Sequence, residues 1–334
     1  MNGLRSVGIL ATGSYTPEKV LTNADLEKMV ETSDEWIVTR TGIRERRISA
    51  PDQAASDLAY EAAVKALAKA NLSAEQLDMI IVATVTPDTM FPSTACILQE
   101  KLGATKASAL DVSAACTGFL YGITTASQFI STGMYKYILV IGVEVLSKIT
   151  NYEDRNTCVL FGDGAGAAIL GPVADEFGFK AFELGADGSG GNLLSQQAGG
   201  SRKPATHETV ESNLHYIQMT GSEVFKFAVR VMNSATEAVL DKAGVEKEEI
   251  GLLVPHQANL RIIDAAIKRF GLSEDKVAIN VDRYGNMSSA SIPVALDEAV
   301  QEGRVKEGDN VVLVGFGGGL TWGAALCKWG SKEA

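Results

Sequence analysis

The sequence is poor in the features that disulfide-rich, secreted and membrane proteins require. It has four widely spaced cysteines among 334 residues and no CxxC pair, which argues against a disulfide framework and a zinc ribbon. Thiols without partners are typical of a reducing compartment, so we expect a cytoplasmic protein. The N-terminal residues lack the basic-then-apolar pattern of a signal peptide, and apolar runs such as residues 137–143 are too short to span a bilayer. We expect no membrane association.

Positive charge is also scarce. Lys and Arg number 30 against 41 Asp and Glu, which gives a formal net charge of −11. Nucleic-acid-binding proteins need a basic face, so we expect no nucleic acid partner. An acidic protein partner could dock only on a local basic patch of this acidic surface. The length predicts about two domains, and the content of 46% hydrophobic and 21% charged residues is ordinary for a globular protein.

Several common catalytic and cofactor-binding motifs are missing. Residues 162–167 read Gly-Asp-Gly-Ala-Gly-Ala and lack the third glycine of the dinucleotide-binding GxGxxG pattern. The sequence contains no P-loop, no HExxH and no GxSxG. We therefore expect neither a bound cofactor nor a metal ion.

The sequence does contain an alternation of short apolar runs and helix-like stretches. The runs at residues 78–83, 109–112 and 137–142 are continuously apolar, as is typical of strands buried on both faces of a sheet. Strands that alternate with helices in this way predict an α/β protein.

A long-period repeat divides this pattern in two. Residues 138–142 resemble residues 311–315 at an offset of 173, and the helix-like stretch that ends at Asn71 resembles, at the same offset, the one that ends at Gly244. We interpret the chain as two homologous halves.

The predicted halves cover residues 1–172 and 221–334, with a connecting region at residues 173–220. Within that region, residues 185–203 are rich in Gly, Ser and Gln and therefore loop-like. They form either a plain surface loop or the wall of a substrate tunnel, and composition favours neither.

Cys116 stands at the junction of a predicted strand over residues 108–112 and a predicted helix. Phe119, Ile123 and Ile130 recur at helical spacing in that helix. A thiol at a helix N-terminus faces unpaired N–H groups and the positive end of the helix dipole, and both stabilise the thiolate. The segment therefore predicts an activated nucleophile, although a small, buried, inert cysteine remains the alternative.

Two polar residues of the second half stand in comparable settings. An offset of 170 from Cys116 gives Asn286, in a glycine-containing turn between a predicted strand over residues 277–281 and a predicted helix. His256 follows the predicted strand over residues 252–254, and α/β folds bind ligands at strand ends. We expect these three side chains to meet in one pocket.

A glycine cluster near the C-terminus is the fourth element. Residues 315–323 read Gly-Phe-Gly-Gly-Gly-Leu-Thr-Trp-Gly, with four glycines in the first five positions. Residues without a side chain let the backbone approach a ligand and let N–H groups converge on it. A tight turn is the simpler explanation, but it requires fewer glycines.

Together, Cys116, the segment His256-Gln-Ala-Asn259, Asn286 and the glycine cluster resemble the thiolase superfamily. More narrowly, they resemble its 3-oxoacyl-[acyl-carrier-protein] synthase III family, the initiating condensing enzymes of type II fatty acid synthesis. Residues 32–47 are similar to the N-terminal signature of that family, and the resemblance covers essentially the whole chain. It implies a thiolase-like fold in which duplicated halves form an α-β-α-β-α layering.

The resemblance implies an acyltransferase. Its reaction joins an acyl-CoA primer, acetyl or short branched, to malonyl-[acyl-carrier-protein] by decarboxylative Claisen condensation, so CoA thioesters are substrates and not cofactors. Cys116 would carry the acyl group, while His256 and Asn286 would stabilise the enolate formed on decarboxylation. The backbone N–H groups of Cys116 and Gly318 would form the oxyanion hole. An asparagine at position 286, where elongating synthases carry a second histidine, favours the initiating type.

The resemblance also implies binding roles for five further residues. Trp36 and Arg155 would flank the adenine of CoA, Arg40 would contact the nucleotide, and Asn259 would contact the pantetheine. Phe91 would cross the interface of a homodimer into the acyl pocket of the partner.

Carrier proteins are acidic in this family, so their docking requires cations on this acidic chain. Arg261 and Lys268 are seven residues apart on the predicted helix after His256 and share a face, with Arg269 beside them. A solvated charged face is the alternative to a docking site.

Three other functions stay open at this point. Another CoA-dependent condensing enzyme, of the polyketide or hydroxymethylglutaryl type, would not depend on a carrier protein. A cysteine–histidine hydrolase would admit water and ignore malonyl thioesters. A non-catalytic α/β binding protein would have no specially reactive thiol.

Overall fold

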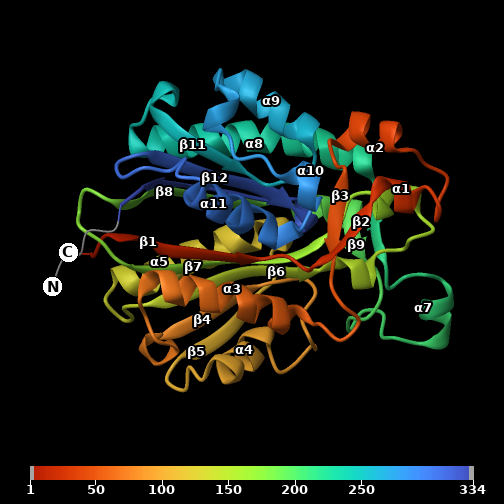
Figure 1. The fold of residues 1–334 in the computed structure, drawn as a ribbon, viewed down its shortest axis with the longest axis horizontal. Coiled ribbons are helices and arrows are strands. Elements are labelled where there is room, and N and C mark those ends of the chain that lie inside the picture. The colour runs from red at the N-terminus through yellow and green to blue at the C-terminus, as the bar shows by residue number, and fades with distance from the viewer. Residues whose placement is uncertain (1–3, 331–334) are drawn as a thin grey trace.

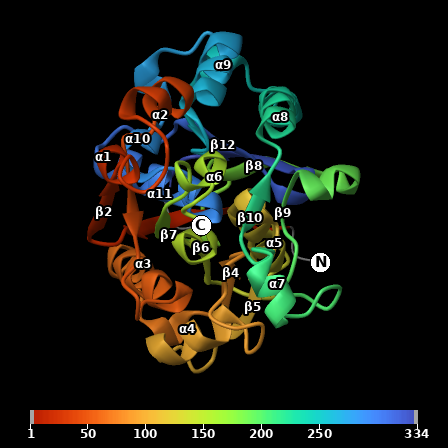
Figure 2. The same cartoon turned by 90° about the vertical axis from the view of Figure 1, so that its right-hand side faces the viewer.

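The computed structural model describes residues 4–330 and arranges them in five layers (Figure 1). Two β-sheets enclose a central pair of helices, and two further helices cover the outer face of each sheet (Figures 1 and 2). From one outer layer to the other, the helices are α8 (Gly221–Ala243) with α9 (Leu260–Phe270), α5 (Gly118–Ser131) with α11 (Ser291–Gln301), and α3 (Ala55–Ala70) with α4 (Thr94–Leu102). The predicted α-β-α-β-α layering is confirmed.

The first sheet lies between α3 and the central helices. Its strand order is β1-β7-β6-β4-β5, in which β6, β4 and β5 are mutually parallel and β7 is antiparallel to both β1 and β6. The strands are β1 (Val7–Tyr15), β4 (Met79–Ala83), β5 (Ser108–Val112), β6 (Ile138–Val145) and β7 (Asp163–Pro172). All residues of β4 and β6 are buried, as their continuous apolar runs predict.

The second sheet has the order β8-β13-β12-β11. β12 is parallel to β11 and antiparallel to β13, which is antiparallel to β8. The strands are β8 (Gly178–Ala186), β11 (Ile250–Pro255), β12 (Asn310–Gly317) and β13 (Thr321–Lys328). This order repeats that of the first sheet without its fifth strand.

The prediction of a strand over residues 277–281 is wrong. Only Val277 pairs there, through an isolated parallel bridge to Leu253, and helix α10 (Val281–Tyr284) begins where the strand should end. The backbone N–H groups of Asn280 and Val281 donate to the side-chain oxygen of Gln257. A side chain thus replaces the strand partner.

The strand registers confirm the duplication. Ile80 of β4 pairs with Leu139 of β6, and Leu253 of β11 pairs with Val312 of β12, so both partners shift by 173 residues (253 − 80 and 312 − 139). The same offset relates two 3₁₀ turns, η2 (Ala115–Thr117) before α5 and η7 (Ser288–Ala290) before α11.

The remaining elements lie outside the two main sheets. The segment at residues 173–220 provides edge strand β8 and a two-stranded ribbon, while the domain boundaries at residues 172 and 220 stay a prediction. The smaller elements are α1 (Asn23–Leu26), α2 (Asp34–Thr41), α6 (Arg155–Cys158), α7 (His207–Glu211), β2 (Lys19–Thr22) paired with β3 (Glu45–Ile48), β9 (Leu194–Gln196) paired with β10 (Ile217–Met219), and the 3₁₀ segments η1 (Ala74–Gln76), η3 (Leu146–Ile149), η4 (Gly188–Leu193), η5 (Lys247–Glu249), η6 (Glu274–Lys276) and η8 (Gly318–Leu320). None of the helices within residues 4–330 has both the length and the apolar character that a membrane crossing requires.

Candidate active site

Cys116 lies in the turn η2, between strand β5 and helix α5. Cys116 is 5% exposed. The preceding Ala115 has φ +47°, a left-handed backbone conformation that residues other than glycine rarely adopt. Gly317, the last residue of β12, permits the close approach of this turn, because a Cβ there would lie 2.6 Å from the backbone nitrogen of Cys116. The glycine cluster therefore borders the nucleophile, as expected.

Two cavities meet at Cys116. The first, of about 90 Å³, is also lined by His256, Asn286, Asn259 and Phe316. The second has a volume of about 130 Å³ and a mostly apolar lining. Besides Cys116, it is lined by Val85, Ala115, Leu146, Ile149, Phe161, Leu194, Ser195, Gln196, Ile217, Ser288 and Gly318. The structure thus brings the three predicted catalytic side chains to one cavity.

His256 presents a neutral imidazole to the first cavity. Its backbone N–H donates to the Val314 carbonyl, which extends the pairing of β11 with β12 by one residue. The ring packs edge-to-face on Phe316, with 5.3 Å between centroids, and Nδ1 is buried without a hydrogen-bond partner among the described residues. Burial lowers the pKa of His256 to about 3. A neutral ring can both donate and accept a proton.

Asn286 is fixed so that its amide N–H₂ is left for a ligand. Its backbone N–H donates to the Leu160 carbonyl and its carbonyl accepts from Gly162 N–H. The side-chain oxygen accepts a 2.8 Å hydrogen bond from the backbone N–H of Ser288. Since Oδ1 is occupied, the donors on Nδ2 are the groups that Asn286 can offer to the cavity.

The prediction that Cys116 is a thiolate is wrong for the resting protein. Burial is the main cause that raises the pKa of the Cys116 thiol to about 12, while hydrogen bonds from Ser288 and from its own backbone oppose this. Desolvation disfavours the charged form. The cysteine therefore rests as a thiol, and its proton must leave as it attacks.

The assignment of Asn286 as the counterpart of Cys116 needs correction. The register offset of 173 pairs Cys116 with Ser289, the middle residue of η7, and pairs Ala115 with Ser288, which also has a positive φ (+44°). Asn286 reaches the cavity from a position three residues before this counterpart. It does so because Leu160 and Gly162 hold its backbone, which an offset cannot predict.

Trp36 and both predicted nucleotide-binding arginines form one cluster. Trp36 lies in α2, and the guanidinium carbons of Arg40 and Arg155 lie 4.7 and 5.0 Å from its ring centroid. Arg155 also donates to the Glu31 carbonyl. A separation of 5.0 Å leaves no room for a third planar ring, so an adenine between Trp36 and Arg155 would require Arg155 to move.

Comparison with known proteins decides the family. Residues 110–188 match the family model described as 3-oxoacyl-[acyl-carrier-protein] synthase III, and residues 240–329 match the model of its C-terminal part. The beta-ketoacyl-[acyl-carrier-protein] synthase III of Caldanaerobacter subterraneus is 63% identical over 324 residues, 97% of this chain and 98% of the relative. That of Desulfitobacterium hafniense is 61% identical over 327 residues, 98% and 99% of the two chains. The chain belongs to the 3-oxoacyl-[acyl-carrier-protein] synthase III family.

The fold agrees with this assignment. The crystal structure of the synthase III from Aquifex aeolicus superposes with a TM-score of 0.90 at 49% identity, covering 97% of this chain and 100% of the other. The chain is therefore an acyltransferase of the condensing-enzyme type that initiates fatty acid synthesis. Hydrolase and non-catalytic binding functions are thereby set aside.

The remaining residues expected for a synthase III are placed as follows. Gly318 lines the second cavity beside Cys116, and Asn259 caps helix α9 by accepting from Arg261 N–H while it donates to the Arg40 carbonyl. Phe91 is 85% exposed on the loop after β4. Their functional roles stay predictions.

The three cations expected to dock a carrier protein lie on α9, as predicted, and differ in their surroundings. Arg261 stacks over the ring of Phe225, a residue that lines the first cavity, at 5.3 Å. Lys268 is exposed. Arg269 is paired with Glu237 of α8 at 2.7 Å, which neutralises it. Arg261 and Lys268 are therefore the charges left for a partner.

Sequence reasoning missed two groups of site residues. Ser288, whose hydroxyl contacts the Cys116 thiol, carries no motif of its own, and only its offset of 173 from Ala115 could have pointed to it. Residues 194–196 of the glycine-rich connecting region line the second cavity, so this part of the predicted loop is a wall of the site.

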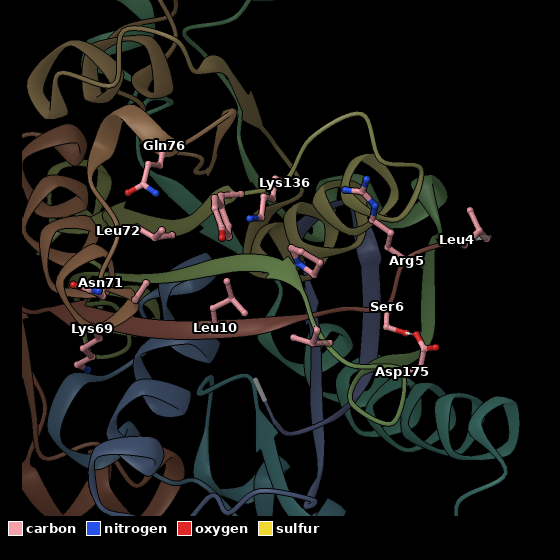
Figure 3. A pocket seen from close by; sticks show the side chains of 14 residues that line it. Leu4, Arg5, Ser6, Leu10, Lys69, Asn71, Leu72, Gln76, Lys136 and Asp175 are labelled. Atoms are coloured by element: carbon pink, nitrogen blue, oxygen red, sulfur yellow. Dashed lines mark hydrogen bonds between the residues drawn. The ribbon is translucent and has the colours of Figure 1, made fainter. Parts of the chain in front are cut away.

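A larger cavity lies elsewhere. It has a volume of about 810 Å³, and Arg5, Lys69, Lys136 and Asp175 are among its lining residues (Figure 3). None of the predicted site residues lines it. Within residues 4–330, no group of three or more His, Cys, Asp or Glu side chains is placed to hold a metal ion.

Proposed function

We propose that this synthase III transfers an acyl group from acyl-CoA to Cys116 and then condenses it with malonyl-[acyl-carrier-protein]. The observation that carries the proposal is the position of Cys116 between two unlike cavities. The apolar cavity fits the tail of a short acyl primer, and the other cavity presents the donors of His256 and Asn286. CoA thioesters are then substrates, and the reaction requires neither a cofactor nor a metal ion.

The first half-reaction forms an acyl-enzyme. The Cys116 sulfur attacks the thioester carbonyl of acyl-CoA while its proton passes to the neutral imidazole of His256. Backbone N–H groups of Cys116 and Gly318 receive the developing oxyanion. CoA leaves as a thiolate and takes the proton, so His256 returns to its neutral form.

The second half-reaction removes CO₂ from the malonyl thioester. The electron pair of the breaking C–C bond moves onto the thioester oxygen, where the N–H groups of His256 and Asn286 stabilise the enolate. The enolate carbon then attacks the acyl-Cys116 carbonyl. The Cys116 thiolate leaves and takes up a proton from the solvent, and 3-oxoacyl-[acyl-carrier-protein] is released.

We also propose that the enzyme is a homodimer of the cytoplasm. β5 is an edge strand of the first sheet, and Met90 and Phe91 are 79% and 85% exposed on the loop after β4. Large exposed apolar side chains beside an unpaired strand edge favour a protein interface. All four cysteines are free, as expected in a reducing compartment.

The acylation site gives the direct test. Incubation with labelled acyl-CoA, followed by peptide mapping, should place the label on Cys116. The other cysteines are internal controls, since Cys96 is exposed while Cys158 and Cys327 are buried. Label on any of these three instead would refute the proposal, and condensation that proceeds equally with malonyl-CoA would favour a polyketide-type synthase.

Docking of the acidic carrier protein is tested by charge reversal. Arg261→Glu combined with Lys268→Glu should raise KM for malonyl-[acyl-carrier-protein], and added salt should weaken docking of the unaltered enzyme. The matched control is Lys247→Glu with Lys306→Glu, because these exposed lysines precede β11 and β12, at the ends opposite the active site. Equal KM values for the two double variants would place the docking surface elsewhere.

A further inference from the structure

A buried carboxyl group, that of Glu144, lies beside the nucleophile without a role in the chemistry above. Glu144 is the penultimate residue of β6 and is 0% exposed. No Lys, Arg or His side chain pairs with it in the part of the chain that the structure describes. An ionised carboxylate buried without a cation is costly, so its hydrogen bonds decide its protonation state.

One carboxyl oxygen, Oε2, receives only donors. The hydroxyl of Thr86 lies 2.7 Å from it and the Thr84 hydroxyl 3.3 Å. The backbone N–H of Val85 lies 3.1 Å from Oε2 and 3.3 Å from Oε1, so it donates mainly to Oε2. Both hydroxyls are free to donate, because Thr86 Oγ1 accepts from Val145 N–H and Thr84 Oγ1 accepts from Thr86 N–H. Oε2 is therefore an acceptor.

The other oxygen, Oε1, faces the Ser289 hydroxyl, whose one hydrogen can be donated to the Ala83 carbonyl oxygen instead. Ser289 Oγ has two near acceptors, Glu144 Oε1 at 2.9 Å and the Ala83 carbonyl oxygen at 2.8 Å, while the Val143 carbonyl oxygen lies 3.4 Å away. A serine has one hydrogen, and a carbonyl can only accept it. With Glu144 ionised, one of the two acceptors would face a lone pair. With a proton on Oε1, Glu144 donates to Ser289, Ser289 donates to Ala83, and each group is satisfied.

The charged and titratable surroundings agree with a neutral acid. The Cys116 thiol of η2 is the titratable group that interacts with Glu144, and the residues around it on β4, its following loop and η7 contribute hydroxyls and backbone groups. Asp163 of β7 stands opposite Val145 and is held by Ser147 and by Ser49 N–H instead. Burial raises the pKa of Glu144.

The duplication shows what this acid does in the fold. At the offset of 173 the counterpart of Glu144 is Gly317, and that of Ser289 is Cys116. Gly317 lets the nucleophile turn approach β12, whereas in the other half Glu144 binds the corresponding residue of η7. The same carboxyl group accepts a hydrogen bond from the backbone N–H of Val85. Val85 and Ser288, the neighbour of Ser289, both line the apolar cavity beside Cys116.

We propose that Glu144 is a positioning residue that carries a proton on Oε1 at neutral pH and fixes η7 and the loop after β4 around Cys116. As a neutral acid it joins these segments without placing a negative charge opposite the thiol. This part of the proposal rests on the proposed role of Cys116, while the protonation state does not.

The protonation state is tested by stability. The pKa of Glu144 is higher in the folded than in the unfolded protein, so above the ordinary pKa of a glutamic acid the folded state holds the extra proton and loses stability as pH rises. Urea unfolding should show the equilibrium constant of the parent growing by up to about tenfold per pH unit relative to Glu144→Gln, which cannot ionise. Glu223→Gln, at an exposed carboxyl, is the control without such a slope. A ratio that stays constant or reverses would show an ionised Glu144 and overturn the assignment.

The positioning role is tested by rescue. Glu144→Ala should slow acylation of Cys116 by about 100-fold, as a displacement of ~1 Å does. Glu144→Gln should restore most of it, because its amide donates to Ser289 and accepts from Thr86 as the neutral acid does. Equal rates in the Ala and Gln variants would remove the positioning role. If the label falls on another cysteine, the proposed function fails, yet the stability measurement still decides the protonation state.

Discussion

Removal of the amide at Asn286 should separate the two half-reactions. Asn286 lines the first cavity, and its Oδ1 accepts from Ser288 N–H, so its Nδ2 supplies the donors. Asn286→Ala deletes both functions. Asn286→Asp keeps an acceptor for Ser288 and removes the donors, so the pair of variants distinguishes a lost donor from a disturbed turn.

The expected magnitudes follow from these two roles. Loss of one donor to a developing oxyanion raises the barrier by about 2.7–4 kcal/mol, or about 10²–10³ in rate, so both variants should lose most decarboxylation. Only Asn286→Ala strands the buried N–H of Ser288, which should lower its free energy of unfolding by about 1–3 kcal/mol. Acylation of Cys116 requires no group of Asn286 and should continue in the Ala variant.

The assay measures CO₂ release from labelled malonyl-[acyl-carrier-protein] beside acyl-enzyme formation by intact mass, with urea unfolding as the stability measurement. Cys116→Ala gives the complementary case, because it cannot be acylated but keeps the donors of His256 and Asn286. Normal CO₂ release by a folded Asn286→Ala protein would remove Asn286 from the mechanism and leave it a packing residue.

Three further outcomes are expected. Below pH 6.5 the unfolded chain binds a proton at His256 that the folded protein excludes down to about pH 3. The free energy of unfolding should therefore fall by up to about 1.4 kcal/mol for each pH unit of acidification. If the difference in unfolding free energy between the parent and His256→Gln did not change with pH, this reasoning would be contradicted. Trp36→Ala should raise KM for acyl-CoA by about tenfold through lost base stacking, and an equal rise for an acyl-pantetheine, which has no adenine, would place the adenine elsewhere. Gly317→Ala should displace Cys116, slow its alkylation and lower the free energy of unfolding by about 1–3 kcal/mol. Gly188→Ala is the neutral control, because no atom lies within 4 Å of the added carbon. Equal rates of Cys116 alkylation in the two variants would refute the close approach of Gly317.

Most of the architecture could be predicted from the sequence because it depends on local patterns. Continuous apolar runs marked β4 and β6, and the strand over residues 108–112 has the predicted bounds. The repeat at 173 residues predicted two homologous halves, and the two sheets share their strand order. The strand over residues 277–281 failed because a distant side chain, Gln257, takes its backbone hydrogen bonds.

The chemistry of the site was predictable only in kind. Residue type and a place after a predicted strand pointed to Cys116 and His256, while Asn286 was found from an approximate offset and the family resemblance. Only the tertiary structure showed that Ser289 is the counterpart of Cys116, and that the glycine-rich loop contributes Leu194 to the cavity.

The charge states also belong to the tertiary structure. A helix N-terminus in the sequence predicts a thiolate, yet the packed protein around Cys116 raises its pKa to about 12. Desolvation depends on every chain segment that excludes water from a group, and those segments converge only in the fold. The sequence by itself determined which residues could react, through local pattern and residue chemistry. Burial and the hydrogen bonds between distant segments decided in which direction the pKa values of Cys116, His256 and Glu144 depart from their ordinary values.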